Sequence, residues 1–126
     1  MPNSAKILLI EDEKMLSSMY STKFTKEGYN LVAAYDGEEG LAKAKTEKPD
    51  LILLDIIMPK LDGFVVLKAL KEDSSLKDIP VILLTNLGQD EDIKKGKELG
   101  ANDYFIKANH TPAEVVEKAR AVLEKK

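Results

Sequence analysis

Short apolar runs alternate along the chain with segments in which apolar residues recur at helical spacing. The runs occupy residues 6–10, 30–34, 50–54, 80–84 and 103–106. The first, third and fourth are continuous rather than alternating, which is typical of parallel strands covered on both faces. A strand followed by a helix is thus predicted five times over. Such alternation implies a parallel sheet with right-handed crossovers and helices on both faces.

The segments between the runs have the spacing and the ends of amphipathic helices. Gly28 and Gly100 are placed to end the first and fourth helices, and Thr111 is placed to cap the last helix ahead of Pro112. The expected core positions recur every three or four residues: Leu16, Met19, Tyr20 and Phe24; Leu41 and Ala44; Phe64, Leu67 and Leu70; Ile93 and Leu99; Val115, Val116, Ala119, Val122 and Leu123.

Length and composition restrict this pattern to one domain and exclude several kinds of site. The chain has 126 residues, 44% of them hydrophobic, so we expect a single domain over residues 1–126 with no output domain. With no cysteine and one histidine, disulfides, cysteine-bound zinc and histidine-rich metal sites are excluded. A net charge of −3 argues against direct nucleic-acid binding.

The apolar runs also bear on location. None approaches the roughly 20 residues needed to span a bilayer. The first residues do not have the basic and apolar regions of a signal peptide. We therefore expect a cytoplasmic protein that does not contact a membrane.

Polar side chains directly follow four of the five runs. They are Glu11 and Asp12 after the first, Asp55 after the third, Thr85 and Asn86 after the fourth, and Lys107 after the fifth. Because ligands of open parallel sheets bind outside the carboxyl ends of the strands, we expect these side chains at one edge. Asp55 is the most informative, since it interrupts an apolar stretch where an unpaired carboxylate would be costly.

Each acid also has a simpler interpretation. One alternative role for Asp55 is a turn cap ahead of Asp62-Gly63, but it precedes that turn by too many residues. The alternative role for Glu11 and Asp12 is that of helix caps, which acids before a helix often are. Three crowded carboxylates repel one another, however, and Mg²⁺ relieves this while keeping water and recruiting phosphate oxygens. Lys107 would then supply positive charge to a phosphoryl group.

These residues resemble the receiver domain of two-component response regulators. The most specific stretch is LDIIMPKLDG at residues 54–63, supported by IEDE at 10–13, LTN at 84–86, GANDY at 100–104 and Lys107. The resemblance covers roughly residues 5 to 124. It implies a flavodoxin-like (βα)5 fold, a doubly wound parallel sheet of five strands in the order 2-1-3-4-5.

The resemblance also implies a role for each matching residue. Asp55 would be the phosphoacceptor, with Thr85 and Lys107 holding the phosphoryl oxygens and Thr85 and Tyr104 acting as the switch. Glu11, Asp12, Asp55 and the carbonyl of Ile57 would bind Mg²⁺. The donor would be a sensor histidine kinase or phosphotransfer protein. A downstream protein would bind the face formed by the fourth helix, fifth strand and fifth helix. The domain would be regulatory rather than an enzyme.

The chain departs from the family at one position and is apolar at two others. Ala108 follows Lys107, where the family usually has proline in a cis bond, so we expect a trans bond and a different loop. We expect His110, in that loop, to be a surface residue. Ile57 and Leu87, two residues beyond Asp55 and Thr85, cannot hydrogen-bond an attacking water, so we expect slow loss of the phosphoryl group.

Three other functions fit the pattern less well. A haloacid-dehalogenase-like phosphatase uses Asp-x-Asp, but position 57 is isoleucine. A nucleotide-binding fold requires a glycine-rich loop after the first strand, and residues 11–14 contain no glycine. The third is a phosphorylation-independent interaction module. Such a module would not require the acids Glu11, Asp12 and Asp55 or Lys107, all of which are present.

Overall fold

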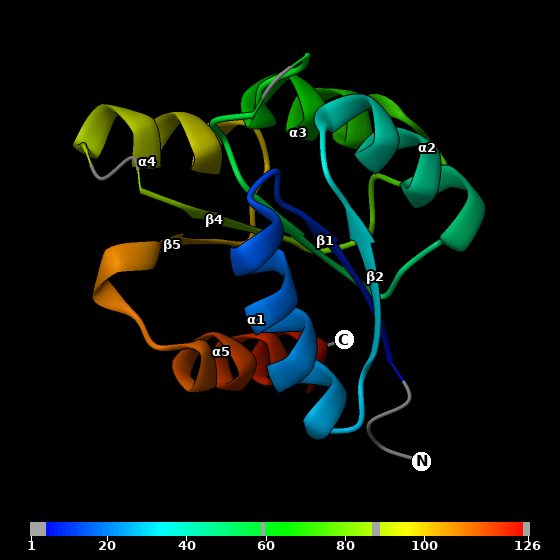
Figure 1. Cartoon of the computed structure of the whole chain (residues 1–126). Helices are drawn as coiled ribbons and strands as arrows, with labels where there is room; N and C mark the ends of the chain where they lie inside the picture. Colours follow the sequence, from blue (N-terminus) through cyan, green and yellow to red (C-terminus); the bar gives the residue numbers. More distant parts are fainter. Residues whose placement is uncertain (1–4, 59, 87–88, 125–126) are drawn as a thin grey trace.

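A single sheet of five parallel strands forms the centre of the computed structural model, which describes residues 5–58, 60–86 and 89–124 (Figure 1). The strand order is β2-β1-β3-β4-β5, so the order expected from the family resemblance is confirmed. The strands are β1 (Lys6–Ile10), β2 (Asn30–Ala34), β3 (Leu51–Leu54), β4 (Val81–Thr85) and β5 (Asp103–Ile106).

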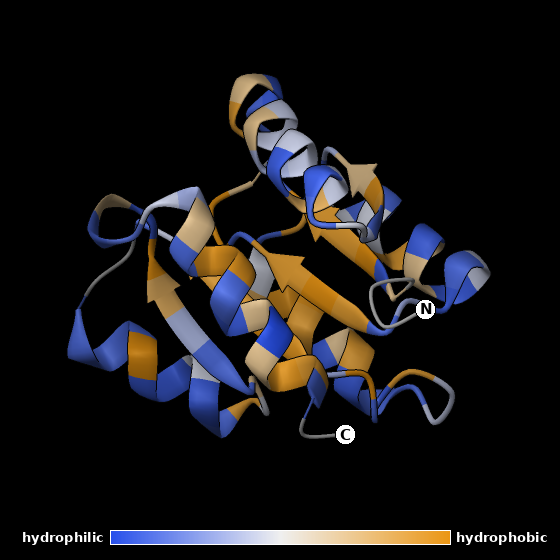
Figure 2. Ribbon diagram, turned by 90° about the horizontal axis from the view of Figure 1, so that it is seen from below, coloured by the Kyte–Doolittle hydropathy of each residue, from blue (hydrophilic) through white to orange (hydrophobic). Residues whose placement is uncertain are grey.

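The inner strands β1, β3 and β4 are buried on both faces, which explains why their sequences are continuous apolar runs. Figure 2 shows the inner strands of the sheet in the orange of hydrophobic residues. Alternate residues of one strand serve opposite faces: Ile7 and Leu9 of β1 belong to one hydrophobic cluster, and Leu8 and Ile10 belong to the other. A one-residue shift in register would exchange the two sets.

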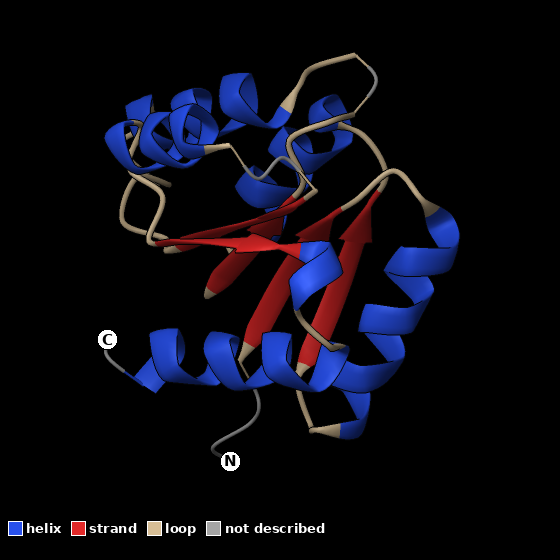
Figure 3. Ribbon diagram, turned by 90° about the vertical axis from the view of Figure 1, so that its left-hand side faces the viewer, coloured by secondary structure: helices blue, strands red, loops and turns tan. Residues whose placement is uncertain are grey.

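Helices cover both faces of the sheet, as Figure 3 shows. The helices α1 and α5 lie on one face, and α2, α3 and α4 lie on the other. No helix in the described ranges combines the length and apolar composition that crossing a bilayer requires. The bounds are α1 (Lys14–Lys26), α2 (Gly37–Glu47), α3 (Gly63–Glu72), α4 (Asp90–Glu98) and α5 (Pro112–Glu124), with a short 3-10 helix, η1 (Lys107–Asn109).

The predicted helix ends are found close to the expected residues. Gly28, with φ of +94°, follows α1 in the left-handed conformation that favours glycine. At the start of α5, the Thr111 hydroxyl accepts a hydrogen bond from the Glu114 N–H (3.2 Å). The Glu114 carboxylate in turn accepts one from the Thr111 N–H (2.8 Å), which completes a capping box.

The buried face of α1 differs from the predicted one. Ser17, Tyr20 and Phe24 are buried, whereas Met19, predicted as core, is 42% exposed. Helical spacing defines an apolar stripe only to within about one position, and here the small Ser17 occupies one of the buried positions. In α4 the buried residue is Gly96, because that helix packs closely on β4 and β5, while Ile93 and Leu99 are only partly buried.

Candidate functional site

The carboxyl ends of β1, β3, β4 and β5 surround a pocket of about 240 Å³. Sheet order produces this arrangement, because β1 and β3 are hydrogen-bonded neighbours and so are β4 and β5. The residues predicted to gather at this edge lie close together. The pocket is lined by Glu11, Asp12, Glu13, Asp55, Ile57, Thr85, Asn86 and Lys107.

Three carboxylates form a compact cluster in the pocket. One oxygen from each of Glu11, Asp12 and Asp55 lies within 4.8 Å of the others. Glu11 is 1% exposed and Asp55 is 5% exposed, so water screens their charges poorly. A hard divalent cation with oxygen ligands suits such a set, since Mg²⁺ takes few protein carboxylates and keeps part of its water shell. These residues could therefore hold a metal ion.

Lys107 balances part of this negative charge from β5. Its ammonium group pairs with Asp55 Oδ2 at 3.0 Å and also with Glu11 Oε1. Burial opposes the protonation of Lys107, but the hydrogen bond to Glu11 and the charge of Asp55 outweigh it, so the pKa of Lys107 is raised. Burial also raises the pKa of Glu11, despite the opposing hydrogen bonds from Lys107 and Glu13. Lys107 is therefore a protonated cation at neutral pH.

Local backbone contacts fix the position of Asp55. Its Oδ1 accepts a hydrogen bond from the Ile56 N–H at 2.7 Å, and its own N–H donates to the Ile10 carbonyl at 3.0 Å. Gly63, the first residue of α3, lies so close that an added Cβ would be 2.3 Å from the Asp55 carbonyl oxygen. The start of α3 thus packs directly on the backbone of the acid, and only glycine fits there.

The helix-cap interpretation of the acids finds limited support. The N-cap of α1 is Glu13, whose side chain makes no capping hydrogen bond. Glu11 Oε2 accepts a hydrogen bond from the Glu13 N–H at 3.0 Å, so one of its oxygens orders the loop while the other faces Lys107. Asp55 precedes α3, but the N-cap of that helix is Asp62, which accepts from Val65. Glu13 itself was not singled out from the sequence, and only its place beside the acids points to it.

The two residues expected to act as a switch occupy neighbouring strands. Thr85 is the last residue of β4 rather than the first after it, and its buried side chain lines the pocket. Tyr104 is on β5 and is paired with Leu83 of β4, which precedes Thr85 by two residues. Tyr104 is partly buried against the hydrophobic cluster that contains Leu83. Burial raises the pKa of Tyr104 to about 12. Tyr104 therefore lies behind the pocket rather than in it.

The loop after Lys107 forms the short helix η1, where the family usually has proline. No cis peptide bond occurs in the described ranges, as expected for the Lys107–Ala108 bond. His110 is partly buried, with its ring 5.1 Å from that of Phe105, and it does not line the pocket. Ile57, 60% exposed, lies at the pocket mouth, whereas Leu87 and Pro59 lie outside the described residues.

Fold and site together define a doubly wound α/β protein with a carboxylate–lysine centre at the carboxyl edge of its sheet. The family model of the response regulator receiver domain matches residues 7–120, and the chain belongs to this family. It is therefore a receiver domain of the kind found in two-component response regulators.

Relatives of known name and structure agree with this assignment. The alkaline phosphatase synthesis transcriptional regulatory protein PhoP of Bacillus subtilis is 41% identical over 95% of this chain. The DNA-binding dual master transcriptional regulator RpaA of Synechocystis is 40% identical over the same share. The chain spans about half the length of these relatives, 49% in both cases.

Among solved structures, a Francisella response regulator receiver domain matches with a TM-score of 0.89 and 30% identity, over 97% of this chain and 98% of that one. The chemotaxis protein CheY4 of Vibrio cholerae matches with a TM-score of 0.88 and 32% identity, over 94% and 98%.

Proposed function

We propose that this receiver domain accepts a phosphoryl group on Asp55 in a Mg²⁺-dependent reaction and thereby switches a partner-binding surface. The observation that carries the proposal is the buried Asp55 carboxylate, which lies beside two further acids and is paired with the buried Lys107. A buried acid that lies beside other acids and is also paired with a lysine is arranged for phosphoryl chemistry rather than for stability alone. The proposal treats residues 1–126 as a single receiver domain and assigns them no output activity.

In the proposed reaction, a carboxylate oxygen of Asp55 attacks the phosphorus of the donor. The new oxygen–phosphorus bond forms as the bond to the donor's nitrogen or oxygen breaks, and the donor atom keeps the electron pair. The Ile56 N–H and Lys107 hold the two Asp55 oxygens and so orient the carboxylate for the attack. Lys107 can then donate to a phosphoryl oxygen and stabilise the charge that develops there.

Mg²⁺ would be held by Glu11, Asp12, Asp55 and the carbonyl of Ile57. When bound, it supplies positive charge to the phosphoryl oxygens. The donor set supports this choice, because all four ligands are oxygens and no cysteine is present in the chain. The donor would be a sensor histidine kinase, a phosphotransfer protein or a small phosphodonor.

The acyl phosphate adds negative charge beside Thr85 and Tyr104. In the proposed switch, Thr85 bonds the phosphoryl group and Tyr104 moves into the space that this vacates. The surface made by α4, β5 and α5 then changes and is recognised by a downstream protein. The position of Tyr104 on β5, packed against α4, supports this route.

Labelling with a small phosphodonor tests the proposal. We expect a Mg²⁺-dependent, acid-stable and base-labile phosphoryl group on the wild-type protein and none on Asp55→Asn. Asp78→Asn, which removes an exposed aspartate ahead of β4, is the matched control and should label normally. Equal labelling of Asp55→Asn and wild type would overturn the proposal.

The same experiment separates the other candidate functions. A phosphatase would release phosphate continuously from added phosphomonoesters, and a phosphorylation-independent interaction module would not be labelled at all. A nucleotide-binding protein would respond to nucleotide without transfer. The absence of a second acid at position 57, where the exposed Ile57 lies at the pocket mouth, favours the receiver over the phosphatase.

A further inference from the structure

Asn86 brings a side-chain amide to the wall of the candidate site. It follows β4 directly, it is exposed to solvent, and it lines the same pocket as Asp55 and Lys107. An amide carries two N–H donors and a carbonyl acceptor without a net charge. It therefore adds to the pocket a kind of group that the acids and the lysine do not supply.

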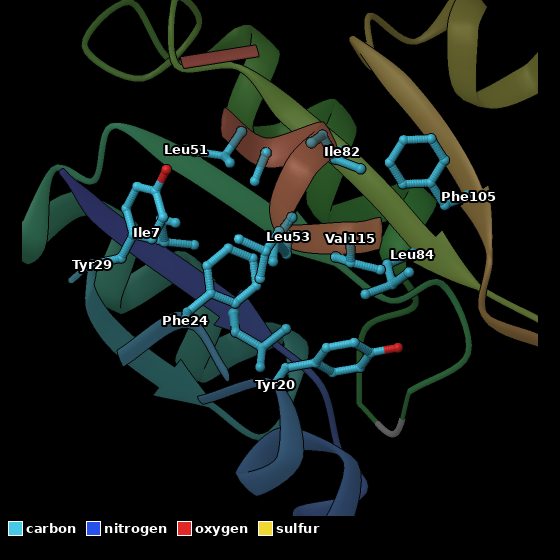
Figure 4. Close-up of a cluster of buried hydrophobic side chains, with 13 residues drawn as sticks. Ile7, Tyr20, Phe24, Tyr29, Leu51, Leu53, Ile82, Leu84, Phe105 and Val115 are labelled. Atoms are coloured by element: carbon cyan, nitrogen blue, oxygen red, sulfur yellow. The ribbon is translucent and has the colours of Figure 1, made fainter. Parts of the chain in front are cut away.

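The last two strands of the sheet place Asn86 beside Lys107. Leu84 of β4 pairs with Phe105 of β5, and Figure 4 shows both side chains in the hydrophobic cluster on neighbouring strands. Asn86 and Lys107 each lie two residues further on, so they occupy corresponding positions just beyond the two strands. Neighbouring strands are about 4.8 Å apart. The amide and the ammonium group thus belong to adjacent parts of the pocket wall.

The pocket has an acidic side and a side of hydrogen-bond donors. The carboxylates follow β1 and β3, whereas the ends of β4 and β5 contribute a hydroxyl, an amide and an ammonium group. A phosphoryl group on Asp55 would be repelled by the acids and would need donors for its oxygens. Among the described residues that line the pocket, the side-chain donors are Thr85, Asn86 and Lys107.

Asparagine also has structural uses, which other residues of the chain illustrate. In a turn, a side-chain oxygen accepts from the backbone two residues further on, as Asp73 Oδ1 does from the Ser75 N–H at 2.8 Å. Asn102 Oδ1 instead accepts from the Val81 N–H at 3.0 Å and joins two loops of the sheet. Within the described ranges, the side chain of Asn86 makes neither kind of contact. Its amide is therefore available to a ligand.

We propose that Asn86 is a phosphoryl-binding residue, whose side-chain N–H donates a hydrogen bond to a phosphoryl oxygen on Asp55. This inference rests on the proposed phosphoacceptor function of Asp55. Because the amide is uncharged, it stabilises the phosphoryl group without drawing Glu11 or Asp55 away from Lys107. A hydrogen bond to a charged oxygen is about twice as strong as one between neutral groups, so a single amide has a measurable effect.

Fluoroberyllate, which has the shape and charge of a phosphoryl group when bound to a carboxylate, tests the inference at equilibrium. With saturating Mg²⁺, we expect Asn86→Ala to bind it about three- to tenfold more weakly than the wild type, since one hydrogen bond is lost. Asn86→Asp removes the donors and adds a negative charge, so it should bind more weakly still. Asn109→Ala, which removes an exposed amide outside the pocket, is the matched control and should bind like the wild type.

Mg²⁺ affinity without fluoroberyllate separates phosphoryl binding from metal binding. It should be the same for Asn86→Ala and the wild type, because the amide contacts the phosphoryl group rather than the metal. Weaker Mg²⁺ binding by Asn86→Ala would overturn the inference and make Asn86 a metal ligand. Thermal unfolding without ligands should be unchanged, since the side chain is exposed, and it establishes that each variant is folded.

Two further outcomes would also overturn the inference. Equal fluoroberyllate affinity for Asn86→Ala and the wild type would mean that the amide makes no contact with the phosphoryl group. Tighter binding by Asn86→Ala would mean that the side chain only obstructs the pocket. If the wild-type protein neither binds fluoroberyllate nor is labelled by acetyl phosphate, the proposed function fails, and the inference fails with it.

Discussion

The site combines three acids with one buried lysine, so it carries excess negative charge before any ligand binds. Glu11, Asp12 and Asp55 contribute three negative charges and Lys107 one positive charge, a net of −2 within a few ångströms. Repulsion of this kind lowers stability when the charges are buried, and it is tolerated at sites where a cation is to be bound. Function and stability are therefore opposed at these residues.

Asp55→Asn is expected to leave the domain at least as stable as the wild type, or up to about 1 kcal/mol more stable. The amide keeps the shape and an acceptor for Lys107, while Glu11 still balances the ammonium group. Urea unfolding measures the difference. A large loss of stability would mean that the Asp55 charge is needed for folding.

The effect of Mg²⁺ on the free energy of unfolding gives a second measure of the repulsion between these acids. At a concentration ten times its dissociation constant it should stabilise the wild type by about 1.4 kcal/mol, and Asp55→Asn by clearly less. Na⁺ at matched ionic strength controls for screening of the charges.

Ile57 is expected to slow hydrolysis of the acyl phosphate, because it lies at the pocket mouth and cannot hydrogen-bond a water molecule. Leu87, the second apolar residue of this prediction, lies outside the described residues. Ile57→Asn combined with Leu87→Glu should lose the phosphoryl group severalfold faster than the wild type. Decay after removal of the donor is the measurement, and unchanged or slower decay would refute apolar control of water access.

At the scale of elements, the strands were predictable and the contacts between elements were not. Residues 7–10 and 51–54 are continuous apolar runs because both of their faces are buried, a local property that the sequence displays directly. The burial of Gly96 depends on how closely α4 approaches the sheet, and the pairing of Lys107 with Glu11 depends on strand order. The order of the strands was predicted from the family resemblance alone, since helical and strand periodicities contain no information on which strands are neighbours.

The same limit applies to Tyr20. Its spacing marked it as a core residue of α1, and that prediction is confirmed by its burial. Spacing could not show that Met19, beside it in the sequence, is 42% exposed, because that depends on how the helix is rotated against the sheet.

Gly96→Ala tests the close packing of α4. Alanine would gain about 1 kcal/mol of helix propensity, but its Cβ would lie 2.5 Å from Leu83 Cδ1 and 3.1 Å from the Tyr104 ring. Because the Leu83 side chain and the Tyr104 ring must both shift in a packed interior, we expect a net loss of about 1–3 kcal/mol. At the adjacent exposed position, Lys97→Ala compared with Lys97→Gly gives the propensity difference between alanine and glycine alone. If Gly96→Ala proves more stable than the wild type, α4 is packed against Leu83 and Tyr104 more loosely than these distances indicate.

Asp36 couples α2 to the loop after β3 and should make stability depend on acid pH. The hydrogen bond from the Glu39 N–H (2.8 Å) lowers the pKa of Asp36 below its usual 3.8, against a smaller effect of desolvation, and nearby Lys60 lowers it further. A carboxyl whose pKa is depressed by folding contributes stability above its unfolded pKa and loses it as pH falls through the folded value.

Asp36→Asn keeps a capping oxygen and removes the charge. The stability advantage of the wild type over this variant should be complete at neutral pH and should vanish in acid, below pH 3.8. Unfolding by urea across this range measures it. An advantage that persists at the most acid pH would show that the charge is not its source.

At the scale of the molecule, the exposed large hydrophobic side chains are unevenly distributed. Within the described ranges they are Met15 and Met19 of α1, Tyr35 after β2, Ile57 after β3 and Val65 of α3. None lies on α4, β5 or α5. The surface proposed to change on phosphorylation is therefore mainly polar where it is described, and its response should come from movement rather than from uncovering a fixed apolar patch.

Amide hydrogen exchange with and without fluoroberyllate tests where the molecule responds. We expect the largest differences in α4, β5 and α5, which adjoin Tyr104 and Lys107. The amides of α2 serve as the internal reference, since that helix covers the opposite half of the sheet. Changes confined to α1 would contradict this assignment.

The ion pairs of Lys107 have a consequence for a chain that is still being synthesised. Lys107 lies 96 residues after Glu11 and 52 after Asp55, so both acids are made long before their cation. A nascent chain that ends before β5 has the acids but neither the lysine nor the strand that holds it. Phosphodonor labelling of stalled chains of increasing length should therefore begin only once β5 has left the ribosome. The proposed phosphoacceptor site is therefore complete only after the last strand of the sheet has been made.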